Sequence, residues 1–298
     1  MRIDLSACTL CPRECKVDRS KAAGYCGSLE TIKVARAALH MWEEPCISGE
    51  KGSGTVFFSG CPLHCVYCQN RAVAGGGVGK ELSVSELSKV FLKLQKEGAN
   101  NINLVTPTHY IPQIAQALKL AKNNGLSIPI VYNTSGYEKV ESLRKLRGLV
   151  DIYLPDCKYF SPEIGAKYSN APDYYEVAMA AIKEMYEQVG EPCFNEDGIM
   201  TKGVIVRHLL LPGLLEDSKK IIKALYEEYG DGVFLSIMNQ YTPMSGIETK
   251  YPELGMKVTD EEYEALVDYA IEIGVENGFI QEGETATESF IPDFYEEW

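Results

Sequence analysis

The chain has 298 residues, 45% of them hydrophobic, and a formal net charge of -13. This length and apolar content suffice to bury the core of one barrel-sized domain with a small appendage. The acidic balance argues against a nucleic-acid partner, because a protein that binds phosphates over a broad surface needs a basic face.

The sequence predicts neither a membrane-spanning helix nor a signal peptide. No apolar run approaches the ~20 residues that a helix needs to cross a bilayer, so we expect no membrane association. Residues 1–5 are too short and polar for a signal peptide. We therefore expect a cytoplasmic protein, in which the ten cysteines are reduced thiols or metal ligands rather than disulfides.

The first 50 residues carry a group of four closely spaced cysteines, Cys8, Cys11, Cys15 and Cys26. Four thiols packed this early in the chain predict a metal site. Zinc in a small knuckle is one interpretation, since two thiolate pairs can close a tetrahedron. An auxiliary iron-sulfur cluster is the other. The sequence leaves both open, and residues 1–50 are interpreted as a cysteine-rich, metal-binding extension.

A second thiol group follows the apolar run 54–60, where Cys61, Cys65 and Cys68 stand on one short loop. Three thiolates can hold three irons of a [4Fe-4S] cluster and leave the fourth iron open to another ligand. The alternative is structural zinc, which needs a fourth ligand. The nearest candidate is His64, and using it would crowd four ligands into one very short loop.

From residue 54 onward, short apolar runs alternate with amphipathic segments, the pattern of parallel strands joined by crossover helices. The predicted strands are 55–59, 102–106, 128–132, 150–154, 203–210 and 233–238. The predicted helices include 83–97, a second one that contains Ile111, Ile114, Ala115 and Leu118, and then 173–189, 215–229 and 260–277. Ser83 and Glu86 form a capping-box pair at the start of the first helix, and Gly98 follows its end.

Six such units predict an α/β fold, namely a partial (βα)6 TIM-like barrel over residues 51–298 behind the cysteine-rich N-terminal extension. Polar clusters follow the predicted strands. In barrels of this type the catalytic groups lie on the loops at the carboxyl ends of the strands. We therefore expect the active site at that edge.

The spacing Cys-x3-Cys-x2-Cys, with the aromatic Tyr67 before the last cysteine, resembles the signature of radical S-adenosylmethionine (SAM) enzymes. The resemblance implies a [4Fe-4S] cluster on Cys61, Cys65 and Cys68 whose open iron chelates the amino and carboxylate groups of SAM. It implies an electron donor such as flavodoxin or ferredoxin, and reductive cleavage of SAM to a 5′-deoxyadenosyl radical. Tyr67 would lie against the adenine.

Asp156-Cys157-Lys158, Arg207 and Leu211-Pro212-Gly213 further resemble the pyruvate formate-lyase activating enzymes and an uncharacterised iron-sulfur branch related to them. By that resemblance Asp156 lies near the SAM carboxylate and its cation site, Lys158 lies near the substrate as the catalytic candidate, and Arg207 contacts SAM. Without the resemblance, Asp156 and Lys158 are an ion pair at the rim, worth ~0 to 1 kcal/mol if exposed.

Two further positions are candidates for contact with SAM. Radical SAM enzymes commonly carry Gly-Gly-Glu after the second strand, where this chain has Thr106-Pro107-Thr108, so we expect Thr106 or Thr108 to take over the contact with the methionyl amino group. Asn133 and Ser135 follow the third strand and suit hydrogen bonds to a ribose or carboxylate. The alternative for this pair is turn formation.

The leading hypothesis is an oxidoreductase that abstracts hydrogen from a glycine of a partner protein, as the activases of glycyl radical enzymes do. A second hypothesis keeps the radical chemistry but directs it to a small molecule, a peptide or RNA. A third, from another class, is a zinc-dependent structural or binding protein in which both cysteine groups are structural.

Overall fold

The computed structural model describes residues 5–281, 294 and 298, and its centre is one β-sheet. The strand order within it is β10-β9-β8-β6-β5-β4-β2-β1-β3, with β7 paired to β8 outside this path. The strands are β1 Ile32–His40, β2 Ser53–Phe58, β3 Lys80–Leu82, β4 Ile102–Val105, β5 Ile130–Thr134, β6 Ile152–Pro155, β7 Cys193–Phe194, β8 Met200–Leu209, β9 Phe234–Met238 and β10 Gly278–Ile280.

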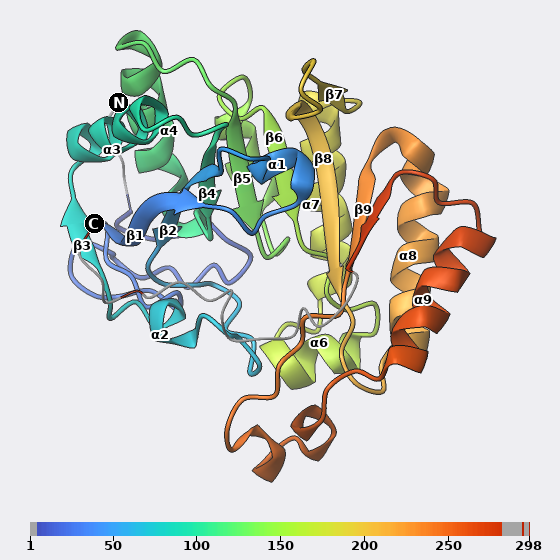
Figure 1. Ribbon diagram of the computed structural model, residues 1–298. Coiled ribbons are helices and arrows are strands. Elements are labelled where there is room, and N and C mark those ends of the chain that lie inside the picture. The colour runs from blue at the N-terminus through green and yellow to red at the C-terminus, as the bar shows by residue number, and fades with distance from the viewer. Residues whose placement is uncertain (1–4, 282–293, 295–297) are drawn as a thin grey trace.

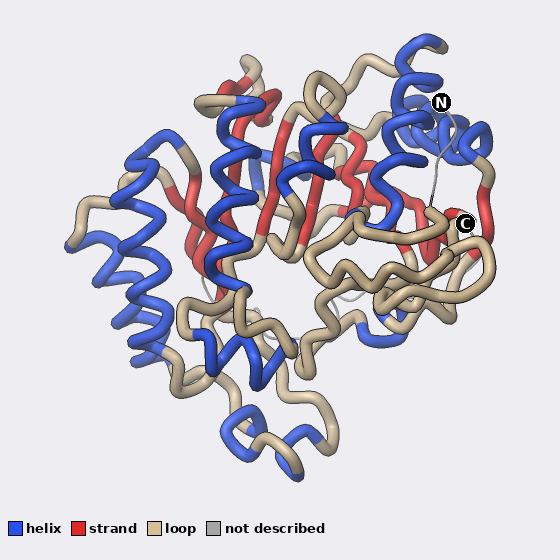
Figure 2. Tube along the Cα trace, turned by 180° about the vertical axis from the view of Figure 1, so that it is seen from behind, coloured by secondary structure: helices blue, strands red, loops and turns tan. Residues whose placement is uncertain are grey.

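The central strands β2, β4, β5, β6, β8 and β9 pair in parallel. The predicted α/β class with a mostly parallel sheet is therefore confirmed. The helices are α1 Pro45–Ser48, α2 Arg71–Ala74, α3 Val84–Lys96, α4 Ile111–Asn123, α5 Val140–Leu143, α6 Pro162–Ser169, α7 Tyr174–Val189, α8 Leu215–Tyr229 and α9 Asp260–Glu272. The long ones cover one side of the sheet, and they lie in front of the strands when the molecule is seen from behind (Figure 2).

The opposite side of the sheet is closed at one end by the short helix α1, which crosses in front of the strands (Figure 1). Cys46 and Ile47 of this helix pack against Val131, Ile152 and Ile205. Since α1 fills this side near the amino ends of the strands, the space that remains for a ligand lies toward their carboxyl ends. Within the described residues, no helix is long and apolar enough to cross a bilayer.

The first long helix illustrates how local sequence sets an element. Ser83 accepts a hydrogen bond from the Glu86 backbone N–H, and the Glu86 side chain accepts one from the Ser83 N–H, as the capping box predicts. Leu87, Phe91 and Leu94 bury one face of this helix. Gly98 then adopts a φ of 95°, a left-handed conformation that suits glycine at the end of a helix.

We expect Ser83→Ala to lower the free energy of unfolding by about 1 kcal/mol, because the cap of α3 is lost. Denaturant unfolding monitored by circular dichroism measures this. Ser85→Ala, two residues along on the exposed side of the same turn, is the control and should change stability by less than about 0.5 kcal/mol. Equal losses for the two variants would contradict a capping role for Ser83.

The structure differs from the prediction at both ends of the sheet. The segment 32–40, placed by the sequence in the extension, is strand β1 and pairs antiparallel with β2. The predicted last helix ends at Glu272 rather than 277, because Gly274 adopts a φ of 102°. The chain then returns to form β10, which pairs in parallel with β9 and lacks a clear alternating pattern in the sequence.

Candidate active site

The loop that carries Cys61, Cys65 and Cys68 leaves β2 through Ser59 and Gly60. Gly60 has a φ of 96°, and a Cβ placed there would overlap Ser28 Oγ and lie 2.6 Å from the Cys26 carbonyl oxygen. The Cys61 N–H donates to the same carbonyl at 3.1 Å. Only glycine therefore lets the loop turn while packed this closely on the N-terminal segment.

Gly60→Ala should destabilise the protein more than Gly98→Ala. Both glycines have nearly the same positive φ, but a Cβ at Gly98 meets nothing within 4 Å. Gly98→Ala is the control. Its free energy of unfolding should fall by only about 1–2 kcal/mol, the cost of placing alanine at a positive φ, whereas Gly60→Ala also displaces the cysteine loop. Denaturant unfolding and iron content after anaerobic reconstitution measure the two effects, and an unchanged iron content in Gly60→Ala would contradict the packing argument.

The three thiols are half-buried and line a common hollow. All three line a cavity of about 180 Å³, and Cys65 and Cys68 also line an adjoining cavity of about 250 Å³. The Leu63 N–H donates to Cys61 Sγ at 3.4 Å, and the Ser169 hydroxyl donates to Cys65 Sγ at 3.1 Å. Such hydrogen bonds to sulfur stabilise metal-bound thiolates and tune cluster potentials.

Within the described part of the chain, the fourth ligand that a zinc ion would need beside these three thiols is not in place. Among residues 5–281, 294 and 298, no three His, Cys, Asp or Glu side chains converge on one ion position. The His64 ring hydrogen-bonds to the Tyr25 carbonyl at 2.9 Å, so in this conformation it does not complete a zinc site. Three cysteine ligands are the number that a [4Fe-4S] cluster with one open iron requires.

Burial, and after it the neighbouring charge of Cys65, raises the pKa of Cys61 to about 11 and that of Cys68 to about 12. As free thiols they would therefore hold their protons at neutral pH. A metal binds the thiolate and displaces the proton, so loading of this loop should release protons and weaken as the pH falls.

Tyr67 lies inside a group of tyrosine rings at one end of the larger cavity. Its ring makes edge contacts with Tyr159, Tyr168 and Tyr241, with centroids 6.4, 6.3 and 6.2 Å away. The Tyr159 hydroxyl donates to its oxygen at 2.8 Å. Tyr67 is thus held rigidly beside Cys65 and Cys68, and its contact with adenine stays a prediction.

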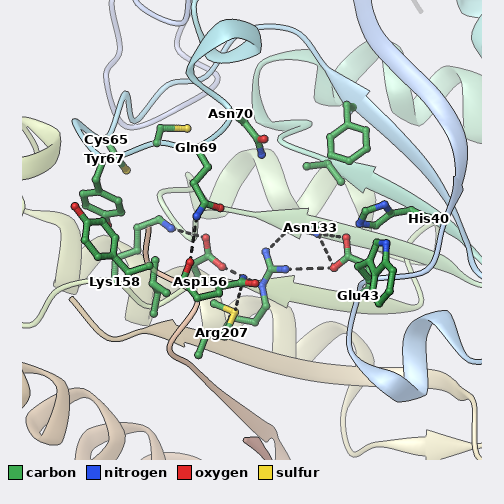
Figure 3. A pocket seen from close by; sticks show the side chains of 18 residues that line it. His40, Glu43, Cys65, Tyr67, Gln69, Asn70, Asn133, Asp156, Lys158 and Arg207 are labelled. Atoms are coloured by element: carbon green, nitrogen blue, oxygen red, sulfur yellow. Dashed lines mark hydrogen bonds and ion pairs between the residues drawn. The ribbon is translucent and has the colours of Figure 1, made fainter. Parts of the chain in front are cut away.

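A row of charged side chains forms the floor of the larger cavity (Figure 3). Asp156 lies at its centre, with Lys158 Nζ at 2.6 Å and Arg207 Nε at 3.0 Å. Arg207 also donates to Asn133 Oδ1 at 2.6 Å. Four residues predicted from the ends of three different strands are therefore brought together within hydrogen-bonding distance.

The electrostatics of this row favour the charged forms. Burial alone would raise the pKa of Asp156, but the charges of Lys158 and Arg207 outweigh it and hold that pKa below its usual range. Burial works against the Lys158 ammonium, and Asp156 reverses the effect and raises the pKa of Lys158. The lysine is thus a cation at the floor of the site.

The sequence interpretation missed Glu43, which follows β1 and completes the row at the end away from Cys65 (Figure 3). Its carboxylate lies 3.3 Å from Arg207 Nη1 and accepts from Asn103 Nδ2 at 2.9 Å. Burial raises the pKa of Glu43 against the opposing charge of Arg207. No local pattern could have found it, because its partners lie far along the chain; the only signal was a Glu-Glu pair directly before Pro45.

Thr106 and Ser135 line the smaller cavity beside the three thiols. Thr106 has a φ of 56°, rare for a β-branched residue and a sign of local strain. The Ser135 hydroxyl is buried and has no hydrogen-bond partner among the described side chains and backbone. Its neighbour Gly136 packs on the Asp156 carbonyl with a φ of 76°, so this segment is both a turn and a wall of the cavity.

Two histidines near the carboxyl ends of the strands lie outside both cavities. His109 Nε2 lies 2.8 Å from the Ser59 carbonyl, and burial lowers its pKa to about 3. His208 Nδ1 lies 2.7 Å from the Cys157 carbonyl, and burial lowers its pKa too. Both are neutral residues that join neighbouring strand ends.

Several known proteins resemble this chain. Uncharacterized protein MJ0674 of Methanocaldococcus jannaschii is 29% identical over 88% of this chain and 74% of that protein. Streptococcus suis SuiB bound to S-adenosylmethionine superposes with a TM-score of 0.51 at 15% identity, over 77% of this chain and 50% of SuiB. SuiB bound to its precursor peptide SuiA gives 0.50 at 14% identity, over 74% and 46%. Methylornithine synthase (PylB) gives 0.51 at 12% identity, over 78% and 74%.

The chain spans about half of the length of SuiB, and at these identities the structural matches establish a shared fold. The family assignment comes from residues 55–225, which match the model of the radical SAM superfamily. This range is more than half of the chain and contains the three-cysteine loop, Asn133, Asp156, Lys158 and Arg207. The chain therefore belongs to the radical SAM superfamily, whose fold implies a [4Fe-4S] cluster and S-adenosylmethionine as its cofactors.

Proposed function

We propose that Cys61, Cys65 and Cys68 hold a site-differentiated [4Fe-4S] cluster and that the enzyme abstracts hydrogen from a glycine of a partner protein or peptide. The observation that carries this proposal is the joint lining of one cavity by Cys65, Cys68 and the row Glu43, Arg207, Asp156 and Lys158. Thiols and fixed charges around the same cavity suit a cofactor whose amino and carboxylate groups bind iron and also contact charged side chains.

Such a cluster with bound SAM would supply a 5′-deoxyadenosyl radical, and the one electron that its formation requires would come from a flavodoxin- or ferredoxin-like donor. Asp156 and Arg207 would orient the amino and carboxylate groups of the methionyl part, with Asn133, Ser135 and Thr106 as further hydrogen-bonding groups. Arg207 is held for this by Asn133 and Glu43, so its guanidinium loses little freedom on binding.

In the substrate step, a glycine Cα–H bond breaks, a C–H bond of 5′-deoxyadenosine forms, and the unpaired electron stays on the glycine. Lys158 lies 2.6 Å from Asp156 beside Cys65 and is the candidate for contact with the substrate backbone. Trp42 lines the cavity and is 64% exposed. An exposed aromatic side chain at the rim supports a peptide segment as substrate, because such a segment must enter from solvent.

We infer further that the strand-helix units of residues 51–298 form a partial barrel and that residues 1–50 are the cysteine-rich extension, with β1 as the segment that joins the two. Every one of the ten cysteines is free, which supports a reducing, cytoplasmic environment.

The experiment that tests the substrate class is deuterium transfer. The reduced enzyme with SAM would be incubated with extract from cells grown on α-deuterated glycine, separated into a dialysed macromolecular fraction and a small-molecule fraction. Deuterium in 5′-deoxyadenosine from the macromolecular fraction alone is expected. Transfer from the small-molecule fraction alone would favour the radical modification of a small molecule, and the same experiment with α-deuterated alanine is the control for amino-acid specificity.

A further inference from the structure

Residues 5–31 wrap beside the cysteine loop as irregular chain, without a helix or strand (Figure 1, violet-blue). Their apolar core consists of Leu5, Cys8 and Leu10, with Cys15 packed against them. So small a core does not hold a segment of this length by itself, and segments of this kind usually depend on a disulfide or a metal. None of the four cysteines here forms a disulfide, so a metal is the candidate for a further stabilising link.

The four thiols are gathered by the local chain path. The Cys8 N–H donates to the Val17 carbonyl at 3.0 Å and the Lys16 N–H to the Cys8 carbonyl at 2.9 Å, which turns residues 8–17 back on themselves. A Cβ at Gly24 would lie 3.3 Å from Cys15 Sγ and 3.6 Å from Cys26 Sγ. Those two sulfurs therefore lie beside the same glycine, in contact range of the position that a Cβ would take.

Cys11 is buried in the same segment, and its carbonyl accepts from the Glu14 N–H at 3.0 Å, which turns the chain between Cys11 and Cys15. In their present rotamers, no three of these described side chains converge on one ion. Rotation of a cysteine about its Cα–Cβ bond moves Sγ between staggered positions without moving the backbone. Metal binding at this site would therefore involve rotation of the cysteine side chains.

A buried arginine beside these thiols supplies a second, independent observation. Arg19 is fully buried, and its guanidinium donates to the Ser28 carbonyl at 3.2 Å and lies 4.0 Å from Cys8 Sγ. Its other acceptors among the described residues are carbonyls, those of His109 and Leu29, and none is a carboxylate. A buried cation needs an opposite charge nearby. Four thiolates around a divalent metal carry a net negative charge and would provide it.

The same segment is bonded directly to the catalytic loop. Arg13, between Cys11 and Cys15, donates to the Pro62 carbonyl at 2.9 Å and to the Ser169 carbonyl at 2.7 Å. The Cys26 carbonyl accepts from the Cys61 N–H. Whatever fixes residues 11–15 and 26 therefore also fixes the backbone on which Cys61 stands.

We propose that Cys8, Cys11, Cys15 and Cys26 form a second, tetrathiolate metal centre, with Arg19 as its buried counter-charge, and that this centre positions the loop of the first cluster through Arg13 and Cys26. The centre is either a zinc ion or an iron-sulfur cluster. Both a zinc site and an iron-sulfur cluster would be negatively charged metal-thiolate units. Metal analysis after reconstitution distinguishes between the two.

Metal content would be measured in a background with Cys61, Cys65 and Cys68 changed to Ala, after separate reconstitution with zinc and with iron plus sulfide. We expect about one zinc, or about four irons and four sulfides, per chain. Adding Cys11→Ala and Cys26→Ala should remove the metal, whereas adding Cys46→Ala, a buried cysteine outside the group, should not. A background protein that binds neither metal, or binds it equally after the added changes, would overturn the proposal.

Two further measurements do not depend on the folding of the cysteine variants. In the wild-type chain, bound metal should protect Cys8, Cys11, Cys15 and Cys26 from iodoacetamide, while the exposed Cys193 reacts with and without metal. Arg19→Met should weaken metal binding by at least about tenfold and Arg19→Lys by much less, because lysine keeps the charge. Unprotected cysteines would contradict the site, and equal affinities of the two Arg19 variants would contradict the counter-charge.

Discussion

Cys65→Ser should abolish SAM cleavage and reduce the iron bound at the catalytic loop to background. Cys65 takes part in both cavities and its sulfur accepts the Ser169 hydroxyl, so this position joins the cluster to the floor of the site. A serine hydroxyl is a poor ligand for iron. The cluster would then be held by two cysteines instead of three, and one iron would lose its cysteine ligand. Cys61→Ser and Cys68→Ser should behave in the same way.

Cys193→Ser is the matched control, since Cys193 is exposed and lies outside the site. It should retain iron, sulfide and the rate of 5′-deoxyadenosine formation. Anaerobic reconstitution followed by iron and sulfide analysis, with 5′-deoxyadenosine measured by chromatography, gives all three values. A Cys65→Ser protein that still cleaves SAM at the wild-type rate would show that the cluster is held elsewhere.

Asp156→Asn should lower both the stability of the protein and the rate of SAM cleavage, with an effect second to that of the cysteine variants. The change removes the carboxylate that Lys158 and Arg207 share and leaves two buried cations with a neutral partner. Breaking a buried pair in this way costs about 3–5 kcal/mol, and Arg207 keeps only Glu43 as a carboxylate partner among the described residues. Displacement of the orienting groups should lower the rate of SAM cleavage by about 10²-fold.

The stability effect of Asp156 should depend on pH with a defined sign. Its folded-state pKa lies below the unfolded value of about 3.9, so its contribution is present above that pH and is lost as the pH falls through the folded pKa. The wild-type and Asp156→Asn proteins should therefore converge in stability in acid. Denaturant unfolding across the pH range measures this.

Asp151→Asn provides the control on the same strand. Asp151 stands at the amino end of β6 and accepts from the Ile130 N–H at 2.9 Å, a bond that an asparagine oxygen can keep. The Asp151→Asn variant should therefore cleave SAM at the wild-type rate. If Asp151→Asn lost activity as Asp156→Asn does, the loss would reflect damage to the strand and not the charged floor.

The sequence predicted the parts of the fold and site that depend on local pattern. Alternating apolar runs and the capping box of Ser83 and Glu86 located the central strands and the first long helix, because periodicity and caps act over a few residues. Asn133 and Asp156 could be placed together because each follows the end of a predicted strand, and parallel strands end at one edge of a sheet. Arg207 lies within its predicted strand and was added by the family resemblance.

The residues that sequence reasoning missed act over long distances. Glu43 lies 164 residues before Arg207 in the sequence, and Arg13 lies 156 residues before Ser169. No local sequence pattern near Glu43 or Arg13 indicates these contacts. The pairing of β1 with β2 spans only the short connection from His40 to Ser53, and it was missed because the sequence interpretation assigned residues 32–40 to the extension. Tertiary packing decided these contacts.

The central claim is that this chain cleaves SAM reductively with a cluster on its three-cysteine loop. Its most direct test is the yield of 5′-deoxyadenosine from anaerobically reconstituted, dithionite-reduced wild-type protein given SAM, with the electron paramagnetic resonance spectrum of the reduced cluster recorded with and without SAM. We predict 5′-deoxyadenosine and methionine in equal amounts and a spectrum that changes when SAM binds the open iron. Reconstituted protein that holds only zinc, or whose cluster leaves SAM intact and shows no spectral change, would contradict it.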